Sequence, residues 1–436
     1  MTTKRPVIPR EYLFPFMLTT TLFALWGFAN DITNPMVAAF KQIMLISHFK
    51  SSLVQFAFYG GYCVMAFPAA LFIKRYTYKS GILVGLGLYA LGALLFIPSS
   101  LALSYGMFLF SYFVLTCGLS FLETSANPYI LSMGPEENAT RRLNFAQAFN
   151  PIGSLTGMLV AKQFILARLD KTPEAERRVL AQLAPDQFRS LQVHDLTILR
   201  GPYVAIGLIV AAFFFIFLIS KLPKAREEDA RNLDIKGTLK RLWENKKYVE
   251  GVIAQTFYVG AQIMCWTFII QYGMNELGMA KETAQGYNMI AMGIFCTSRF
   301  ICTYLLKYFS PGKLLMILAL GGFALILGTI FLKGMIGLYC LIGVSACMSL
   351  MFPTIYGIAL KGLGEDAKLG AAGLIMAIGG GSIMPPLQGA IMDLPDLNLG
   401  FMMLSSTRAS FVLPLICFAV IAVFGYRTSE VYKHEY

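Results

Sequence analysis

The chain has 436 residues, of which 56% are hydrophobic and only 14% are charged, and its formal net charge is +12. Because soluble domains carry about 25% charged residues, this composition excludes a water-soluble fold and predicts an all-α membrane protein. The basic residues lie in a few connecting segments, which indicates contact with anionic membrane lipids and excludes nucleic acid as a partner.

Hydropathy predicts twelve transmembrane helices, each near the roughly 20 apolar residues that cross a bilayer. Three basic residues near the N-terminus, Lys4, Arg5 and Arg10, precede the first hydrophobic segment. This segment is too long for the core of a cleaved signal peptide, so it is expected to be a retained transmembrane span. Basic loops on one side predict that both termini are cytoplasmic. The spans are expected at about 12–40, 51–73, 80–99, 105–131, 143–168, 200–221, 248–273, 284–307, 312–332, 335–361, 370–392 and 409–427.

The first span carries Asn30, Asp31 and Asn34, followed by Pro35. Proline leaves the carbonyl of residue 31 without its helical hydrogen bond, so the helix is expected to loosen here. Amides, a carboxylate and a loosened backbone together suit sugar hydroxyls or a small cation. We therefore predict Asn30 and Asn34 as substrate ligands and Asp31 as a cation-coupling group. The alternative is that these groups only lock the span to a neighbouring helix.

The fourth span carries Glu123, with Asn127 one helical turn later and Pro128 after it. A carboxylate at membrane depth is expensive and usually faces a cavity or a partner. We predict that Glu123 alternates between protonated and charged forms as substrate and cation bind, with Asn127 beside the substrate. The alternative is a structural pair with a buried cation or serine.

The fifth span begins with two amides three residues apart, Gln147 and Asn150, which are expected to face the same way. Amides donate and accept at once, so they match the two-way hydrogen bonding of a sugar hydroxyl. The segment 169–199 is expected to be a long external loop with a short helix around 173–183. The basic linker 222–247 divides the chain into six-span bundles at 1–221 and 248–436, which weak internal repetition supports.

The seventh span carries Gln255, Tyr258, Gln262 and Trp266 on one helical stripe, and Asn288 in the eighth is a weaker member of the set. Amides alternating with rings suit a carbohydrate, although a core stripe would explain the rings alone. Outside this set, Lys162 is expected to reach the headgroups, and Arg299 to bind carbonyls at a helix end. The sequence shows no metal-ligand cluster, no catalytic constellation and no cofactor motif, so an enzyme is not expected.

Several of these segments resemble the bacterial L-fucose–proton symporters of the major facilitator superfamily. The resemblance covers nearly all twelve spans and includes LWGFAN at 25–30, FYGGY at 58–62, LETSANP at 122–128, RLNFAQ at 142–147, YVGAQ at 258–262 and FPTI at 352–355. It implies two six-helix bundles, alternating access, and a role for Glu123 in recognition and protonation, with Gln147 and Asn150 contacting the sugar. One departure is Asn34, which stands where the family has a coupling aspartate and cannot titrate.

We therefore predict a monomeric monosaccharide–H⁺ symporter of the bacterial inner membrane, with no cofactor beyond the co-transported cation. L-fucose, glucose, galactose and an amino sugar all fit the residues. Coupling to Na⁺ is the alternative, because Asp31 and Glu123 could serve either cation. A sugar-binding receptor that does not transport is a rival from another class.

Overall fold

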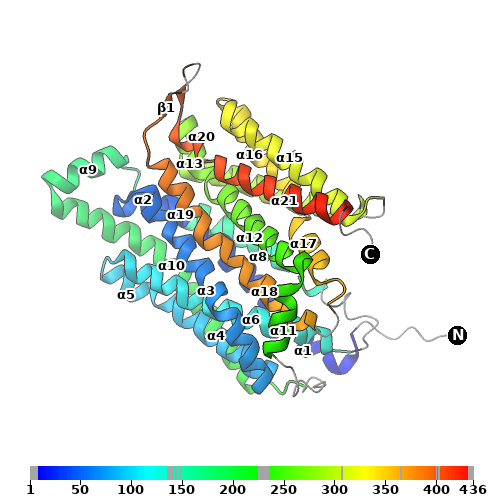
Figure 1. Ribbon diagram of the computed structural model, residues 1–436. Helices are drawn as coiled ribbons and strands as arrows, with labels where there is room; N and C mark the ends of the chain where they lie inside the picture. The colour runs from blue at the N-terminus through cyan, green and yellow to red at the C-terminus, as the bar shows by residue number, and fades with distance from the viewer. Residues whose placement is uncertain are drawn as a thin grey trace.

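The computed structural model describes residues 8–134, 142, 145–147, 149–223, 235–305, 308–363, 366–398, 400 and 403–430. Helices dominate it, and the long ones run side by side along one direction (Figure 1). A short antiparallel strand pair, β1 (Leu397–Asn398) and β2 (Met403–Leu404), lies at one end of the molecule. We call that end, where α9 also lies, the α9 end, and the opposite end, where α11 lies, the α11 end.

We call residues up to 221 the N-half and residues from 248 the C-half. The N-half contains η1 (Arg10–Tyr12), α1 (Leu13–Thr33), α2 (Met36–Met44), α3 (His48–Arg75), α4 (Tyr78–Leu94), α5 (Phe96–Leu101), α6 (Tyr105–Ser132), α8 (Asn150–Val160), the π-helical turn η3 (Ala161–Leu166), α9 (Glu174–Leu183) and α10 (Pro185–Ile219). Helices α11 (Ile235–Glu244) and α12 (Lys246–Thr267) follow, and then α13 (Ile269–Leu277), α14 (Lys281–Leu305), α15 (Pro311–Phe331), α16 (Met335–Met348), α17 (Met351–Leu360), α18 (Ala367–Met376), the 3₁₀ turn η6 (Ala377–Gly379), α19 (Gly380–Met392), α20 (Ser406–Ala409) and α21 (Val412–Glu430).

Within the described residues, nine helices are long and apolar enough to cross a membrane, and a tenth is the pair α12 and α13, bent by 42°. The two remaining expected spans correspond to α8 with η3 and to α14. The span at α8 begins beside residues 143, 144 and 148, which lie outside the described part, and α14 carries Lys281, Glu282 and Arg299, which lower its hydropathy. The arrangement therefore fits the expected twelve-span all-α fold.

The first span is interrupted where the sequence predicts it. Helix α1 ends at Thr33, and α2 begins at Met36, so that Asn34 and Pro35 form the turn between them. Proline has no N–H to continue the helical ladder. The break leaves the Asn34 side chain between two helical segments, where it can reach neighbouring helices.

The expected external loop 169–199 is more helical than predicted. Helix α9 matches the short helix expected around 173–183, but α10 begins at Pro185 instead of near residue 200. The reason is a contact that hydropathy does not detect. The guanidinium of Arg177 lies 2.7 Å from the Asp195 carboxylate, with both side chains fully buried, and this ion pair fixes α9 against the early turns of α10.

The described part of the expected basic linker 222–247 forms helix α11, and residues 224–234 lie outside the described chain. Thr238 and Arg241 of α11 both hydrogen-bond to the carboxylate of Asp366, just before α18. Bonds at 3.0 Å and 2.7 Å attach this helix to the C-half.

The two halves meet along a seam between α3 and α19 (Figure 1). Glycines on the C-half side of this seam have no room for a side chain: a Cβ on Gly389 would lie 2.6 Å from the carbonyl oxygen of His48, and one on Gly379 would lie 2.9 Å from the Cys63 side chain. Small residues let helices approach closely in a membrane. Gly379 and Gly389 of the eleventh span therefore serve packing between the halves.

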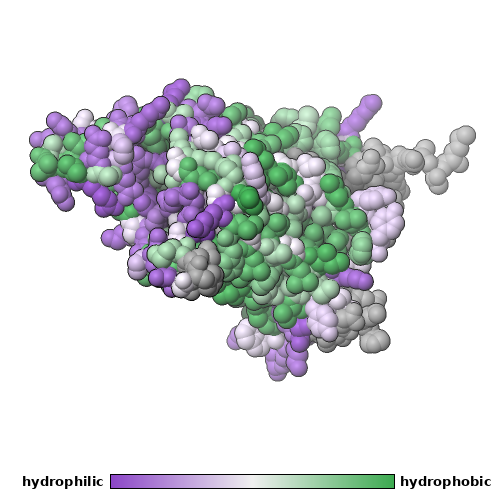
Figure 2. All heavy atoms as spheres, turned by 90° about the horizontal axis from the view of Figure 1, so that it is seen from above, coloured by the Kyte–Doolittle hydropathy of each residue, from purple (hydrophilic) through white to green (hydrophobic). Residues whose placement is uncertain are grey.

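The surface supports a membrane setting. Figure 2 shows hydrophobic residues over the middle of one face and hydrophilic residues gathered toward the side where α9 lies in Figure 1. Large apolar side chains point outward from several spans, including Phe215 at 61% exposure, Ile219 at 80% and Phe300 at 79%. Such an exposed apolar surface is stable only when lipid covers it.

Candidate functional site

A chain of buried polar side chains runs from the first span to the seventh. The Asn34 amide donates to the Asp31 carboxylate at 3.2 Å, and Gln55 of α3 donates to the Asn34 carbonyl oxygen at 3.0 Å. The same Gln55 nitrogen lies 2.9 Å from the Thr267 hydroxyl at the end of α12. We call these four residues the Asp31 network. Because Thr267 belongs to the C-half, the network joins the halves deep inside the protein.

The local backbone explains how this network forms. The turn at Asn34 and Pro35 ends α1 directly after Asp31, Ile32 and Thr33, so the amide folds back three residues to reach the carboxylate. Asp31 is 5% exposed and Asn34 is 2% exposed. Ser154 of α8 lies beside the Asp31 carboxylate as a second hydrogen-bonding neighbour. Among the described residues, the groups that hold Asp31 are therefore neutral.

A second polar group surrounds Glu123 on α6. The Asn127 amide donates to the backbone oxygen of Glu123 at 3.0 Å, and Gln147 donates to the Asn127 side-chain oxygen at 3.3 Å. Tyr62 of α3 and Tyr356 of α17 are electrostatic neighbours of the Glu123 carboxylate. The predicted residues Glu123, Asn127 and Gln147 are thus brought together, beside tyrosines from both halves.

Neither carboxylate has a cationic partner in the described part of the chain. The Asn34 amide and Ser154 lie beside the Asp31 carboxylate, and no described basic side chain forms an ion pair with Glu123. An unpaired carboxylate buried in protein is far costlier as an anion than as a neutral acid. Among the described residues, no cation forms the structural pair with Glu123 that was the alternative expectation.

The remaining N-half amides lie near α1. Asn150 donates to the backbone oxygen of Phe23 at 3.3 Å, and its own backbone packs so closely on Gly27 that a Cβ there would lie 2.2 Å from the Asn150 oxygen. The side-chain oxygen of Asn30 is buried and has no partner among the described residues. Asn30 therefore has an acceptor free for a ligand, whereas the Asn150 amide also serves packing.

The stripe on α12 divides into two kinds of residue. The Tyr258 hydroxyl donates to the Met348 carbonyl at 3.1 Å, and the Trp266 indole donates to the Ser345 hydroxyl at 3.1 Å, so both rings are tied to α16. Gln255 is fully buried, and neither of its amide atoms has a partner in the described chain. Gln262 is half-buried.

Asn288 of α14 is fully buried, and its amide donates to Gln285 at 3.4 Å. Its own side-chain oxygen has no partner within the described ranges. Together with Gln255, it gives the C-half unsatisfied amides deep in the bundle. Ligand contact by the α12 stripe and by Asn288 stays a prediction.

The model of the Major Facilitator Superfamily matches residues 18–385. The L-fucose-proton symporter of Haemophilus influenzae is 54% identical over 98% of this chain and 99% of that protein, and the one of Escherichia coli is 35% identical over 95% and 93%. This chain belongs to the L-fucose–proton symporter family of the Major Facilitator Superfamily. The crystal structure of a Major Facilitator Superfamily transporter, FucP, in the outward conformation is 35% identical to this chain, with a TM-score of 0.71 over 96% of this chain and 99% of that one.

Membership of the Major Facilitator Superfamily makes the chain a multi-pass membrane transporter and not an enzyme. The glucose/galactose transporter of Brucella abortus is also similar to this chain, with 31% identity over 95% of this chain and 94% of that protein.

Sequence reasoning missed two members of this transporter's polar network. Gln55 and Thr267 both lie in apolar surroundings, and they contact each other from positions 212 residues apart. A glutamine inside a transmembrane run is itself a signal, and Gln55 could have been selected on that ground. Nothing local indicates its partner on the seventh span.

Lys162 and Arg299, the two basic residues singled out within the spans, differ in their contacts. The guanidinium of Arg299 donates to the carbonyl of Ser349, at the end of α16, at 3.1 Å and lies over the Phe295 ring at 4.8 Å. It thus binds a helix-end carbonyl, as expected. Lys162 lies in the π-helical turn η3, and its ammonium group is beside Gly286 of α14, on the other half.

Proposed function

We propose that this transporter imports a monosaccharide, L-fucose before glucose or galactose, in symport with H⁺ through alternating access. The symporter from H. influenzae supports this order, because its 54% identity extends over nearly the whole length of both chains. The observation that carries the proposal is a pair of carboxylates, Asp31 and Glu123, that are flanked by amides inside the spans and have no cationic partner among the described residues.

Glu123 is the group that we propose binds and releases the transported proton. The residue is half-buried, and its charge is balanced by no basic side chain in the described chain. A proton taken up with the sugar would neutralise the carboxylate before the halves move. Asp31 is the second proposed coupling group, because Asn34 leaves the first span with no other acid.

The amides are the proposed sugar ligands. Asn30, Asn34, Asn127, Gln147 and Asn150 would form the N-half wall of the site, since each offers donors and acceptors that match sugar hydroxyls. On the C-half, Gln255, Gln262 and Asn288 would supply hydrogen bonds. The Tyr258 and Trp266 rings would supply flat apolar faces for the sugar C–H groups.

The proposed direction of transport follows from charge. The α11 end, with its basic linker, would face the cytoplasm, and the chain would lie in a bacterial inner membrane as a functional monomer. Asp393, at the end of α19, accepts the backbone N–H groups of His48 and Phe49 at 2.8 Å each and so ties the halves together at the α9 end. We propose that the structure is a state closed to the outside.

The experiment is uptake of labelled L-fucose into proteoliposomes with an imposed proton gradient, at fixed sodium. The wild-type chain is expected to accumulate the sugar in response to the gradient. Glu123→Gln, which keeps the shape but cannot carry a proton, is expected to lose accumulation, whereas Glu282→Gln at the start of α14 should behave as wild type. Uptake that follows sodium and ignores the proton gradient would refute the proposed coupling.

A further inference from the structure

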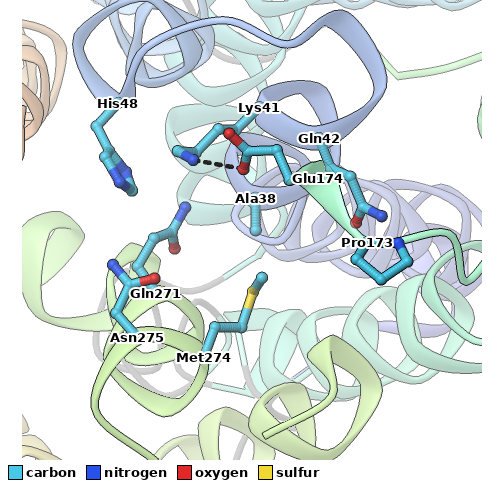
Figure 3. A pocket seen from close by; sticks show the side chains of 9 residues that line it. All are labelled: Ala38, Lys41, Gln42, His48, Pro173, Glu174, Gln271, Met274 and Asn275. Carbon is cyan, nitrogen blue, oxygen red and sulfur yellow. Dashed lines mark hydrogen bonds and ion pairs between the residues drawn. The ribbon is translucent and has the colours of Figure 1, made fainter. Parts of the chain in front are cut away.

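A separate cavity lies at the α9 end, between the two halves. Its volume is about 260 Å³, and its walls come from α2, the start of α3, the segment before α9, and α13. Figure 3 shows side chains from these elements around one space, with His48, Lys41 and Gln271 directed toward it. Since a liquid water occupies about 30 Å³, the cavity has room for about nine waters or one small solute.

Two buried side chains that line this cavity have polar atoms without a hydrogen-bond partner among the described residues. Gln271 of α13 is 2% exposed, and neither its amide nitrogen nor its oxygen has a partner among the described residues. His48, at the start of α3, is 9% exposed, and its Nδ1 is also without a partner there. Buried polar groups are almost always hydrogen-bonded. Unpaired groups that line a cavity therefore indicate a polar occupant.

The chemistry of the walls selects a neutral occupant. The two charged residues of the walls are both paired, because the Glu174 carboxylate lies 2.7 Å from the Lys41 ammonium, as Figure 3 shows, and 2.7 Å from the guanidinium of Arg178. The groups left for a ligand are an amide, which donates and accepts, and an imidazole nitrogen. Met274 and Ala38 add apolar surface on the same walls. This combination matches hydroxyls on a compact carbon ring.

We propose that this cavity is a second monosaccharide site, an outer vestibule that holds sugar before the halves open. The inference rests on the proposed function for the class of its ligand. The vestibule adjoins the contact that ties the two halves together at the α9 end. His48 lines the cavity, and its backbone N–H is one of the two that Asp393 accepts. Sugar in the vestibule contacts His48 of the N-half and Gln271 of the C-half at once.

The test is the number of sugars bound per chain, measured by equilibrium dialysis of the purified full-length protein with labelled L-fucose over a wide concentration range. Wild type is expected to bind two molecules per chain. Gln271→Leu removes the unpaired amide without adding volume, and it is expected to bind one. Met274→Trp fills the cavity while keeping every polar wall group, and it should bind one as well.

Gln187→Leu, at an exposed glutamine of α10, is the matched control and should still bind two. The inference is overturned if wild type binds a single sugar whose affinity neither cavity variant changes, a result that leaves the proposed transport function standing. Absence of both binding and uptake of any monosaccharide would refute the proposed function and the vestibule together. Thermal unfolding of each variant identifies those that are folded.

Discussion

Replacing Asp393 by alanine should open the α9 end of the transporter. The carboxylate accepts two backbone N–H groups at the first turn of α3, at 2.8 Å each, although it belongs to the other half of the molecule. It therefore acts as an N-terminal cap supplied across the seam. Any state in which the halves separate at this end loses the cap, so the interaction stabilises the closed state specifically.

The size of the effect follows from known caps. Losing an N-cap side chain costs about 0.5–2 kcal/mol, and a negative charge at an exposed helix N-terminus contributes about 0.3–1 kcal/mol. Taking about 1–2 kcal/mol for the two bonds together, the ratio of open to closed molecules should rise about 5–30-fold. The overall fold should be little affected, because Asp393 is exposed.

The assay is a distance measurement between spin labels at Arg189 of α10 and Leu397 of β1, which lie on different halves at the α9 end. Asp393→Ala should transfer population to longer distances. Asp396→Ala is the control, because that carboxylate accepts the N–H of Ser406 within its own half at 2.9 Å. Identical distance distributions for wild type and Asp393→Ala would refute the idea that this cap holds the halves together.

Three further predictions concern the polar groups. Glu123→Gln should abolish proton-driven accumulation while sugar counterflow persists, and loss of counterflow as well would contradict a role confined to the proton. Gln55→Leu should destabilise the protein by about 1–3 kcal/mol in a thermal-unfolding assay, because it leaves buried polar partners unsatisfied, and an unchanged stability would contradict the network. Hydrogen bonds from Thr172 hold the pKa of Asp170 below its usual 3.8, so this loop contributes stability that is present above the usual pKa and lost as the pH falls through the lowered one. The protection of residues 170–183 against hydrogen exchange, relative to the unfolded chain at the same pH, should therefore fall only below about pH 4, and a fall near pH 6 would be inconsistent.

The spans could be predicted from the sequence because lipid imposes a simple requirement on length and polarity. The break at Pro35 was equally local, since proline lacks an N–H. The early start of α10 was not predictable in this way. Residues 185–199 are too polar to be recognised by hydropathy, and the buried pair of Arg177 and Asp195 that fixes them joins positions 18 residues apart.

In the candidate site as well, some residues could be predicted from the sequence and others could not. Asp31, Asn34 and Glu123 were recognisable because acids and amides are rare and expensive in a membrane. The contact of Gln55 with Thr267 depends on how the halves meet, which no local pattern contains. Periodicity likewise placed Tyr258 on a stripe but did not reveal that its hydroxyl binds a carbonyl of α16.

Proton movement during sugar entry tests the account most directly. L-fucose added to unbuffered proteoliposomes without an imposed gradient should make the outside more alkaline, in fixed proportion to the sugar taken up, and Glu123→Gln should abolish this change. Sugar uptake without any change of external pH, or a Glu123→Gln protein that still moves protons with sugar, would contradict it.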